Sequence, residues 1–304
     1  MILCCGEALI DMLPRTTAQG APCFAPYPGG AVFNTAIALG RLGAEAGFFS
    51  GLSTDMFGAQ LAAALAASGV DAAPAARSDR PTTLAFVQLV DGHATYAFYD
   101  ENTAGRMLSQ ADLPPVADDT TALFFGGISL VVEPCGATYE ALAAREAPAR
   151  TIMIDPNIRP GFIADAAAYR ARLDRMLGLA DIVKVSDDDL RWIAGEGALD
   201  ALAADLLARG PRLVCVTRGA EGVTGYTADG AVTVPAHPVA VVDTVGAGDT
   251  FNAGVLAALD EAGALAKGAP LPPTVVEAAL SLGARAAAVT VGRAGANPPR
   301  RDEL

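Results

Sequence analysis

Short apolar or β-branched runs alternate along the chain with longer stretches in which apolar residues recur at helical spacing. The short runs predict strands that are buried on both faces of a sheet. They cover residues 2–9, 123–125, 151–154, 182–185 and 213–217. The longer stretches predict helices over residues 31–42, 57–67, 137–145, 166–177, 188–193 and 199–207. This alternation is typical of an α/β fold, in which helices cover both faces of a mainly parallel sheet.

Two segments interrupt the alternation. Residues 83–89 and 95–99 alternate around Asp91-Gly92, which is a typical hairpin turn. Residues 14–28 are rich in turn-forming residues and predict irregular structure. We expect the two segments to form a small accessory sheet. Because no linker rich in Pro, Gly or Ser divides the chain, one α/β domain over residues 1–304 is favoured over two domains.

Composition and charge exclude several classes of protein. Hydrophobic residues make up 52% and charged residues 18% of the 304 positions, which excludes intrinsic disorder. The formal net charge of −13 argues against nucleic-acid and membrane partners. Glu7 and Asp11 interrupt the first apolar run, and no basic segment precedes it, so we expect no signal peptide. The scattered cysteines and the two histidines lack metal-ligand spacing, which favours a cytoplasmic protein with free thiols.

The strongest candidate for chemistry is the segment around Asp249. Small residues, Gly246, Ala247 and Gly248, come directly before a stretch with helical spacing. The first amides of a helix have no internal acceptor, and the helix dipole adds positive charge there, so this segment predicts an anion site suited to phosphate. Asp249 falls in the first turn of that helix. The alternative is that Asp249 only caps the helix and that the glycines only form a turn.

A carboxylate beside an anion site repels a stored phosphate, but it is useful as a proton acceptor for an attacking hydroxyl. The segment therefore points to a kinase. The chain has no phosphate-binding P-loop motif, no dinucleotide-binding glycine motif that opens a helix after a strand, and no G-x-S-x-G nucleophile motif.

Three further segments carry weaker signals. Gly29 and Gly30 precede a predicted helix whose Asn34 offers a donor and an acceptor that suit a sugar hydroxyl, or that bind only nearby backbone. Residues 155–160 follow a predicted strand, where open α/β sheets bind ligands. Residues 184–189 also follow a strand and end in three acids, which favour either a metal environment or a helix start.

These segments read DTVGAGDTFNAG (243–254), GGAVFNTAIALGRLGA (29–44), DPNIRP (155–160) and VKVSDDDL (183–190), and the chain opens with GEALIDMLP (6–14). In this order, and over essentially the full chain, they resemble the PfkB, or ribokinase-like, family of carbohydrate kinases, and bacterial fructokinases in particular. The resemblance implies a Rossmann-like three-layer αβα sandwich with a mainly parallel central sheet and a small β-sheet lid, formed by about 12–28 and 83–99.

The resemblance also implies roles for individual residues. Asp249 matches the catalytic base, with the anion hole at Gly246, Ala247 and Gly248. Sugar-binding positions match Asp11, Gly29, Gly30, Asn34, Phe98, Arg159 and Asp249. ATP-binding positions match Lys184, Ser186, Thr217, Arg218, Gly219, Gly222, Gly246 and Gly248. A monovalent cation, usually K⁺, is implied at Asp243, and an indirect contact with Mg²⁺ at Asp189.

Two positions depart from the family. Ser186 and Asp189 stand where the common motif is N-x-x-E, so metal coordination there is expected to be indirect. Asp100 stands where many fructokinases and 2-keto-3-deoxygluconate kinases have Arg. If it were desolvated and unpaired, Asp100 would repel an anionic sugar acid, which favours a neutral sugar.

We therefore expect an ATP-dependent kinase that converts a neutral sugar, fructose, to its 6-phosphate. The alternatives are a 2-keto-3-deoxygluconate kinase, another sugar or nucleoside kinase of the family, and a sugar or nucleotide sensor without catalysis. An NAD-dependent dehydrogenase is suggested only by the general α/β pattern. Because an open sheet edge invites pairing, we expect a homodimer formed through the lids.

Overall fold

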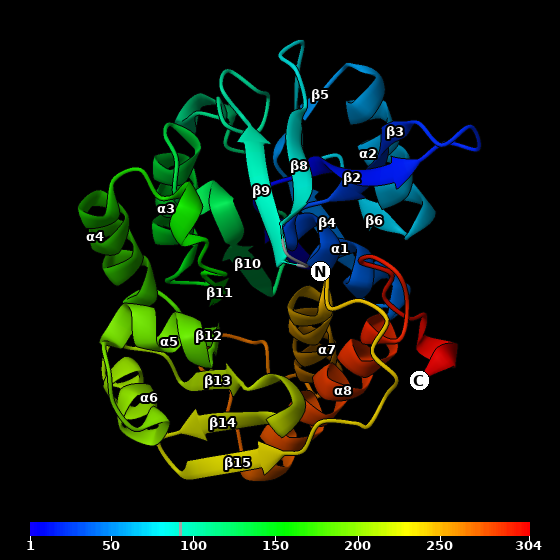
Figure 1. Cartoon of the computed structure of the whole chain (residues 1–304). Coiled ribbons are helices and arrows are strands. Elements are labelled where there is room, and N and C mark those ends of the chain that lie inside the picture. Colours follow the sequence, from blue (N-terminus) through cyan, green and yellow to red (C-terminus); the bar gives the residue numbers. More distant parts are fainter. Residues whose placement is uncertain (91–92) are drawn as a thin grey trace.

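The central element is a nine-stranded sheet with the strand order β15-β14-β13-β12-β11-β10-β1-β4-β6. The structure is a computed structural model and describes residues 1–90 and 93–304 (Figure 1). Every pairing from β6 to β13 is parallel, whereas β14 pairs antiparallel with both β13 and β15. The strands of this sheet are β1 (Ile2–Cys5), β4 (Ala46–Phe49), β6 (Val70–Asp71), β10 (Ala122–Gly126), β11 (Thr151–Asp155), β12 (Ile182–Ser186), β13 (Leu213–Thr217), β14 (Val223–Thr227) and β15 (Gly230–Val234).

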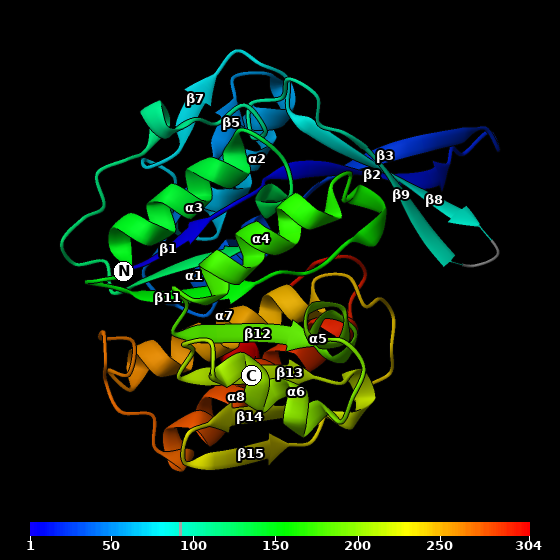
Figure 2. The ribbon, with the colours of Figure 1, turned by 90° about the vertical axis from the view of Figure 1, so that its left-hand side faces the viewer.

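Helices cover both faces of this sheet (Figures 1 and 2). One face carries α1 (Ala31–Arg41), α2 (Met56–Ala67), α7 (Ala247–Glu261) and α8 (Pro273–Val291). The other carries α3 (Cys135–Glu146), α4 (Ala166–Leu177), α5 (Asp187–Ala194) and α6 (Leu199–Leu207). The predicted three-layer α/β architecture is confirmed.

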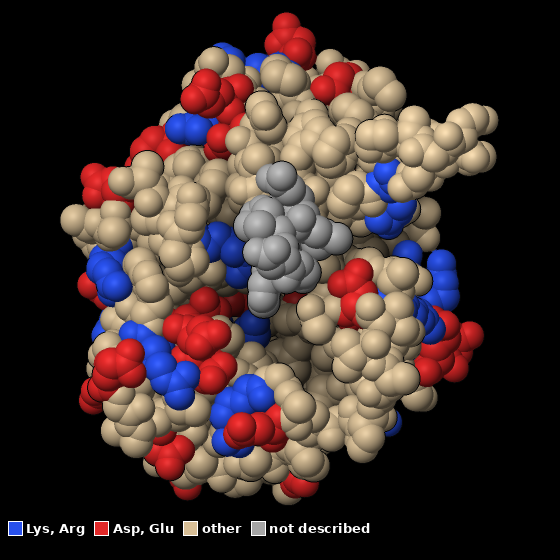
Figure 3. Space-filling view, viewed as in Figure 1, with Lys and Arg blue, Asp and Glu red and all other residues tan. Residues whose placement is uncertain are grey.

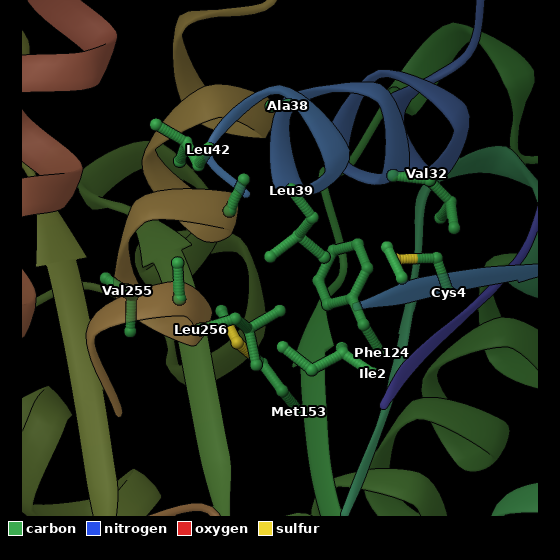
Figure 4. Packing of buried hydrophobic residues seen from close by; sticks show 14 of the residues in the cluster. Ile2, Cys4, Val32, Ala38, Leu39, Leu42, Phe124, Met153, Val255 and Leu256 are labelled. Carbon is green, nitrogen blue, oxygen red and sulfur yellow. The ribbon is translucent and has the colours of Figure 1, made fainter. Parts of the chain in front are cut away.

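Two hydrophobic cores follow from the alternation of side chains along each strand. In β1, Ile2 and Cys4 pack under α1 and α7, while Leu3 and Cys5 pack on the opposite face. Figure 4 shows the first core, where Phe124 lies between the strands and Leu39 of α1. Burial on both faces explains why these strands read as continuous apolar runs.

A second sheet of four strands has the order β3-β2-β8-β9 and projects from the main body (Figure 2). Its strands are β2 (Leu9–Thr16), β3 (Pro22–Gly29), β8 (Thr83–Val90) and β9 (His93–Tyr99). β8 and β9 pair antiparallel, as the predicted hairpin requires, and the expected turn at Asp91-Gly92 lies outside the described residues. Two short strands, β5 (Gly51–Ser53) and β7 (Ala76–Ser78), pair separately.

The expectation of irregular structure over residues 14–28 was wrong, because most of this segment belongs to β2 and β3. Prolines made it look irregular. β3 is an edge strand, where proline is tolerated because one side of the strand needs no donor. Pro14 lies beyond the part of β2 that pairs with β8, so it also interrupts no ladder on that side.

The β14–β15 hairpin and α8 were not predicted from the sequence. By length and composition α8 would be able to cross a membrane. In the fold, its buried residues Val276, Leu280 and Leu282 belong to the core that it shares with α7. The apolar character of α8 is therefore explained by packing.

Candidate active site

The carboxyl ends of the central strands bring polar residues to one edge of the sheet. Asp155 ends β11, Ser186 ends β12 and Thr217 ends β13, and Glu7 follows β1 closely. The start of α7 lies against the same edge, because Lys184 of β12 approaches Gly248. The molecular surface is hollowed beside α7 in the space-filling view (Figure 3). This is where open α/β sheets bind their ligands.

The first turn of α7 leaves backbone donors available. Gly246 caps the helix with φ 77°, a left-handed conformation that favours glycine, and a Cβ there would lie 2.7 Å from Cβ of Ala296. Within residues 1–90 and 93–304, the amides of Gly246, Gly248 and Asp249 donate no hydrogen bond, whereas the Ala247 amide donates to Thr244 O at 3.3 Å. Three of the four amides can therefore receive an anion.

Asp249 is enclosed beside these amides, with 7% of its surface exposed. Its Oδ2 accepts a hydrogen bond from Asn34 Nδ2 of α1 at 2.9 Å. Burial raises the pKa of Asp249 to about 7, the nearby charge of Asp155 acts in the same direction, and the Asn34 hydrogen bond opposes it. A carboxylate with this pKa can hold and release a proton near neutral pH.

Below the first turn of α7 lies a buried ion pair. Lys184 Nζ donates to Asp155 Oδ2 at 3.0 Å, and Asn252 Nδ2 of α7 donates to the same oxygen at 2.7 Å. Burial opposes the charge of Lys184, but the Asp155 carboxylate raises the pKa of Lys184 overall, so the ammonium stays charged. A cation is thus held close to Asp249.

The predicted sugar-binding residues of the N-terminal half meet at the start of α1. Gly30 caps α1 with φ 107°, and a side chain at Gly29 would collide with the Asp11 carboxylate. Asp11 accepts no hydrogen bond within the described part of the chain, and burial raises the pKa of Asp11 to about 6. The Asp11 carboxylate, next to Gly29, is therefore available to a hydroxyl donor.

Phe98 and Arg159 approach this region from β9 and from the loop after β11. Phe98 packs edge-on against Phe162, with ring centroids 4.8 Å apart, and stacks with Tyr96. Partial burial and the charge of Asp11 raise the pKa of Tyr96, while Arg159 opposes this, so both charges lie near Tyr96. Arg159 itself is exposed, and its Nη1 donates only to backbone carbonyls, of which Ile158 O is the nearer at 3.1 Å.

The predicted ATP loop follows β13. The Arg218 amide donates to Gly222 O at 2.8 Å and closes the loop, while its side chain pairs with Glu221. A Cβ at Gly222 would collide with Val234 O, whereas Gly219 is exposed with open space around it. Thr217 Oγ1 donates to Val185 O at 3.4 Å. The loop therefore lies at the same sheet edge as the anion pocket.

The two candidate metal positions serve structural contacts. Ser186 and Asp189 form a reciprocal cap at the start of α5, and both Asp189 oxygens accept backbone amides. Asp243 accepts hydrogen bonds from the amides of Val245 and Gly295 at 3.0 and 2.9 Å. Across residues 1–90 and 93–304, no three His, Cys, Asp or Glu side chains gather as metal ligands.

The charge of Asp100 is paired in the fold. Asp100 is buried, but both of its oxygens accept from Arg106 Nη1 at 3.1 Å. The repulsion of an anionic sugar required an unpaired charge at Asp100, and this condition is not met. The small cavity that Phe162 lines is therefore bordered by the Asp100–Arg106 ion pair and not by an unpaired carboxylate.

Three residues of the site were given no role from the sequence, although Asp155 lies in the segment 155–160 that was expected to bind a ligand. Glu7 binds the amides of Ala31 and Ser129 and so joins the start of α1 to the loop after β10. Asp155 and Asn252 surround Lys184. A strand-end position indicates Glu7 and Asp155, and the three-residue spacing from Asp249 on a helix indicates Asn252.

Comparisons with known proteins agree with this geometry. A family model described as pfkB family carbohydrate kinase matches residues 1–303. A curated fructokinase from Rhizobium leguminosarum bv. trifolii is 62% identical over 259 residues, which cover 85% of this chain and 79% of that protein. A fructokinase structure from Xylella fastidiosa with bound ATP is 31% identical, with a TM-score of 0.87 and coverage of 97% and 93%. A double-mutant fructokinase structure from Vibrio cholerae with fructose, ADP and potassium is 25% identical, with a TM-score of 0.86 and the same coverage.

Proposed function

The chain belongs to the pfkB family of carbohydrate kinases, and we propose that it transfers the γ-phosphoryl group of ATP to the 6-hydroxyl of fructose. The observation that carries the chemistry is the pairing of Asp249 with unused amides at the start of α7. The similarity to fructokinases supports the choice of sugar.

Asp249 acts as the general base. Asn34 holds Oδ2, which leaves Oδ1 to receive the proton of the sugar hydroxyl. As that O–H bond breaks, the sugar oxygen bonds to the γ-phosphorus, the bond from phosphorus to the β-phosphate oxygen breaks, and ADP leaves. The amides of Gly248 and Asp249 stabilise the charge on the transferring phosphoryl group.

The sugar lies between the start of α1 and the four-stranded sheet. Asp11 accepts hydrogen bonds from the hydroxyl groups of the sugar, and Asn34 accepts from or donates to them. Phe98 and Gly30 enclose the sugar ring. The Asp100–Arg106 ion pair also favours a neutral sugar. The Asp100 carboxylate neutralises the Arg106 guanidinium, which would otherwise attract the carboxylate of a sugar acid. The competing substrate, 2-keto-3-deoxygluconate, would find Arg106 paired with Asp100, which leaves the exposed Arg159 as the partner for its carboxylate.

ATP lies across the loop after β13, with its phosphates at the start of α7 and near Lys184. Mg²⁺ arrives with the nucleotide and, when bound, neutralises phosphate charge. The described residues fit this arrangement better than a cage of side chains, since they offer no cluster of three acidic or metal-binding groups. Asp189 and Ser186 would contact the ion through water.

K⁺ would bind at Asp243, as the family pattern implies. Asp243 ties the loop before α7 to the loop after α8. A cation there would stabilise the anion pocket through that loop. The fructokinase structure from Vibrio cholerae contains a potassium ion, which supports the binding of this cation but gives no position for it.

The second sheet would act as the lid and as the dimer interface. Phe98 faces Phe162, so Tyr99 must point to the opposite face, where it packs with Phe86 and, through Phe86, with Phe24. Phe24 is 49% and Tyr99 63% exposed. A second copy would cover this aromatic face. Since all five cysteines are free thiols, we place the enzyme in the cytoplasm.

A substrate panel tests the proposed function. ADP release is measured with fructose, ribose, 2-keto-3-deoxygluconate and nucleosides at equal concentrations. The highest kcat/KM with fructose is the expected result. A preference for 2-keto-3-deoxygluconate would overturn the choice of sugar, and nucleotide and sugar binding without turnover would indicate a sensor.

A further inference from the structure

Lys184 occupies an unusual place for a cation. Its side chain is 5% exposed, and Nζ lies 3.0 Å from the position that a Cβ at Gly248 would occupy. The ammonium therefore lies against the first turn of α7, which is the positive end of the helix dipole. A buried cation at that end is unfavourable unless negative charge compensates it.

The Asp155 carboxylate offsets this cost, because it raises the pKa of Lys184 overall in spite of burial, and Asp155 is itself held in place from three sides. Its Oδ2 accepts from Lys184 and from Asn252, and its Oδ1 accepts from the amide of Asn157 at 3.1 Å. Lys184 has three N–H donors and uses one of them on Asp155. Two donors remain, close to the unused amides of α7.

Asn252 is 1% exposed and donates to Asp155, yet its Oδ1 has no hydrogen-bond partner within the described part of the chain. A buried acceptor without a partner destabilises the folded protein. An apolar residue of similar size would avoid this cost. What Asn252 contributes is therefore the hydrogen bond that it donates to Asp155. It does so from the same helix as Asp249, three residues further along.

We propose that Asp155 and Asn252 are positioning residues, which hold the Lys184 ammonium beneath the amide pocket so that it meets the transferring phosphoryl group as a fixed cation. This inference rests on the proposed function, since it needs a phosphoryl group at the start of α7. The Lys184 ammonium is then charged and fixed in the free protein before the nucleotide phosphate binds, which is a form of preorganisation.

The charged groups around Asp249 shift its pKa in opposite directions. Asp155 of β11 and Glu7, after β1, hinder the ionisation of Asp249, while Lys184 of β12 and the Asn34 hydrogen bond favour it. Asp189 of α5 faces Asp155 and Lys184. Removing Asp155 and removing Lys184 should therefore move the acidic limb of the pH profile in opposite directions.

The test compares Asp155→Asn, Lys184→Met and Asn252→Leu in two assays. ATP binding is measured by calorimetry without sugar, and kcat is measured against pH with saturating substrates. We expect Lys184→Met to weaken ATP binding at least 10-fold and to lower kcat roughly 10²-fold. We expect Asn252→Leu to lower the affinity for ATP and kcat about 10-fold each, while KM for the sugar stays within twofold of the wild-type value. The acidic limb of kcat should move to lower pH in Asp155→Asn and to higher pH in Lys184→Met.

Two further variants keep the test decisive. Thr250→Val, in α7 like Asn252, removes a buried hydrogen bond from Thr290 of α8 and should leave ATP binding and the acidic limb unchanged. If a single charge deletion fails to fold, the double variant Asp155→Asn/Lys184→Met removes both buried charges, and it should bind ATP as weakly as the lysine deletion. Two results would overturn the proposal. One is wild-type ATP affinity in the double variant, and the other is an acidic limb of the kcat profile that does not move in the single variants. Tight ATP binding without turnover on any sugar would instead end the proposed function.

Discussion

Asn34 Nδ2 lies 2.9 Å from Asp249 Oδ2, and this hydrogen bond joins the starts of two helices that are 215 residues apart in the chain. It connects a residue expected to bind sugar with the residue expected to take the sugar's proton. Thr35 supports the same junction, because its Oγ1 donates to the backbone oxygen of Asp249 at 3.2 Å. The geometry of the base therefore depends on α1.

We predict that Asn34→Leu moves the acidic limb of the kcat profile to higher pH. The Asn34 hydrogen bond lowers the pKa of Asp249, so its loss raises that pKa above about 7. A hydrogen bond to a charged group contributes about 1.5–3 kcal/mol, which corresponds to about 1–2 pH units. Thr35→Val is the matched control, since the Thr35 hydroxyl contacts the backbone oxygens of Ala31 and Asp249 and not the Asp249 carboxylate. An unchanged limb in Asn34→Leu would contradict this account.

We predict that Asp249→Asn stabilises the folded protein at pH 8 but not at pH 4. The pKa of Asp249 is raised from 3.8 in a model peptide to about 7 in the fold, so the folded state binds this proton more tightly than the unfolded state. Stability is therefore lost as pH rises from about 4 to about 7, by on the order of a few kcal/mol. Urea unfolding at the two pH values measures the difference. Equal free energies of unfolding for the two proteins at pH 8 would refute the burial argument.

We predict that Asp100→Asn improves the use of sugar acids. The substitution leaves the Arg106 guanidinium without its carboxylate partner, beside a cavity of about 20 Å³ that Glu7 and Phe162 also line. The KM for 2-keto-3-deoxygluconate should fall about 10-fold relative to that for fructose, which corresponds to about 1.4 kcal/mol. Adding Arg106→Gln to the variant should cancel the gain. A gain that survives the second substitution would show that Arg106 is not involved.

We predict that the protein is a dimer at micromolar concentration. Phe24 and Tyr99 are exposed on β3 and β9, which are the two edges of the four-stranded sheet. Contact with a second copy would remove this aromatic face from water. Light scattering should report twice the chain mass for the wild type and a monomer for Phe24→Lys/Tyr99→Lys. A monomeric wild type would argue against an interface through this sheet.

The sequence predicted the parallel part of the fold and the antiparallel β8–β9 pair well, and the other antiparallel strands poorly. Strands such as β11 and β12 are buried on both faces and read as apolar runs, which is a strong signal. β14 and β3 read differently. β14 mixes Thr and Gly with apolar residues, and β3 contains three prolines that only an edge strand accommodates.

The site shows the same division between local and long-range information. The helix start at Gly246 and the position of Asp249 follow from residue spacing in one segment. The contact of Asn34 with Asp249 and the pairing of Asp155 with Lys184 depend on how distant strands and helices pack, which spacing does not encode. The same holds for Asp100, whose partner Arg106 changes the meaning of its charge.

The turnover of Asp249→Asn with fructose and ATP tests the central claim most directly. Loss of the proton acceptor should lower kcat roughly 10²–10⁴-fold, while ATP binding by calorimetry stays within about twofold, because the amide pocket and Lys184 remain. Turnover close to that of the wild type would contradict the role of Asp249 as the base.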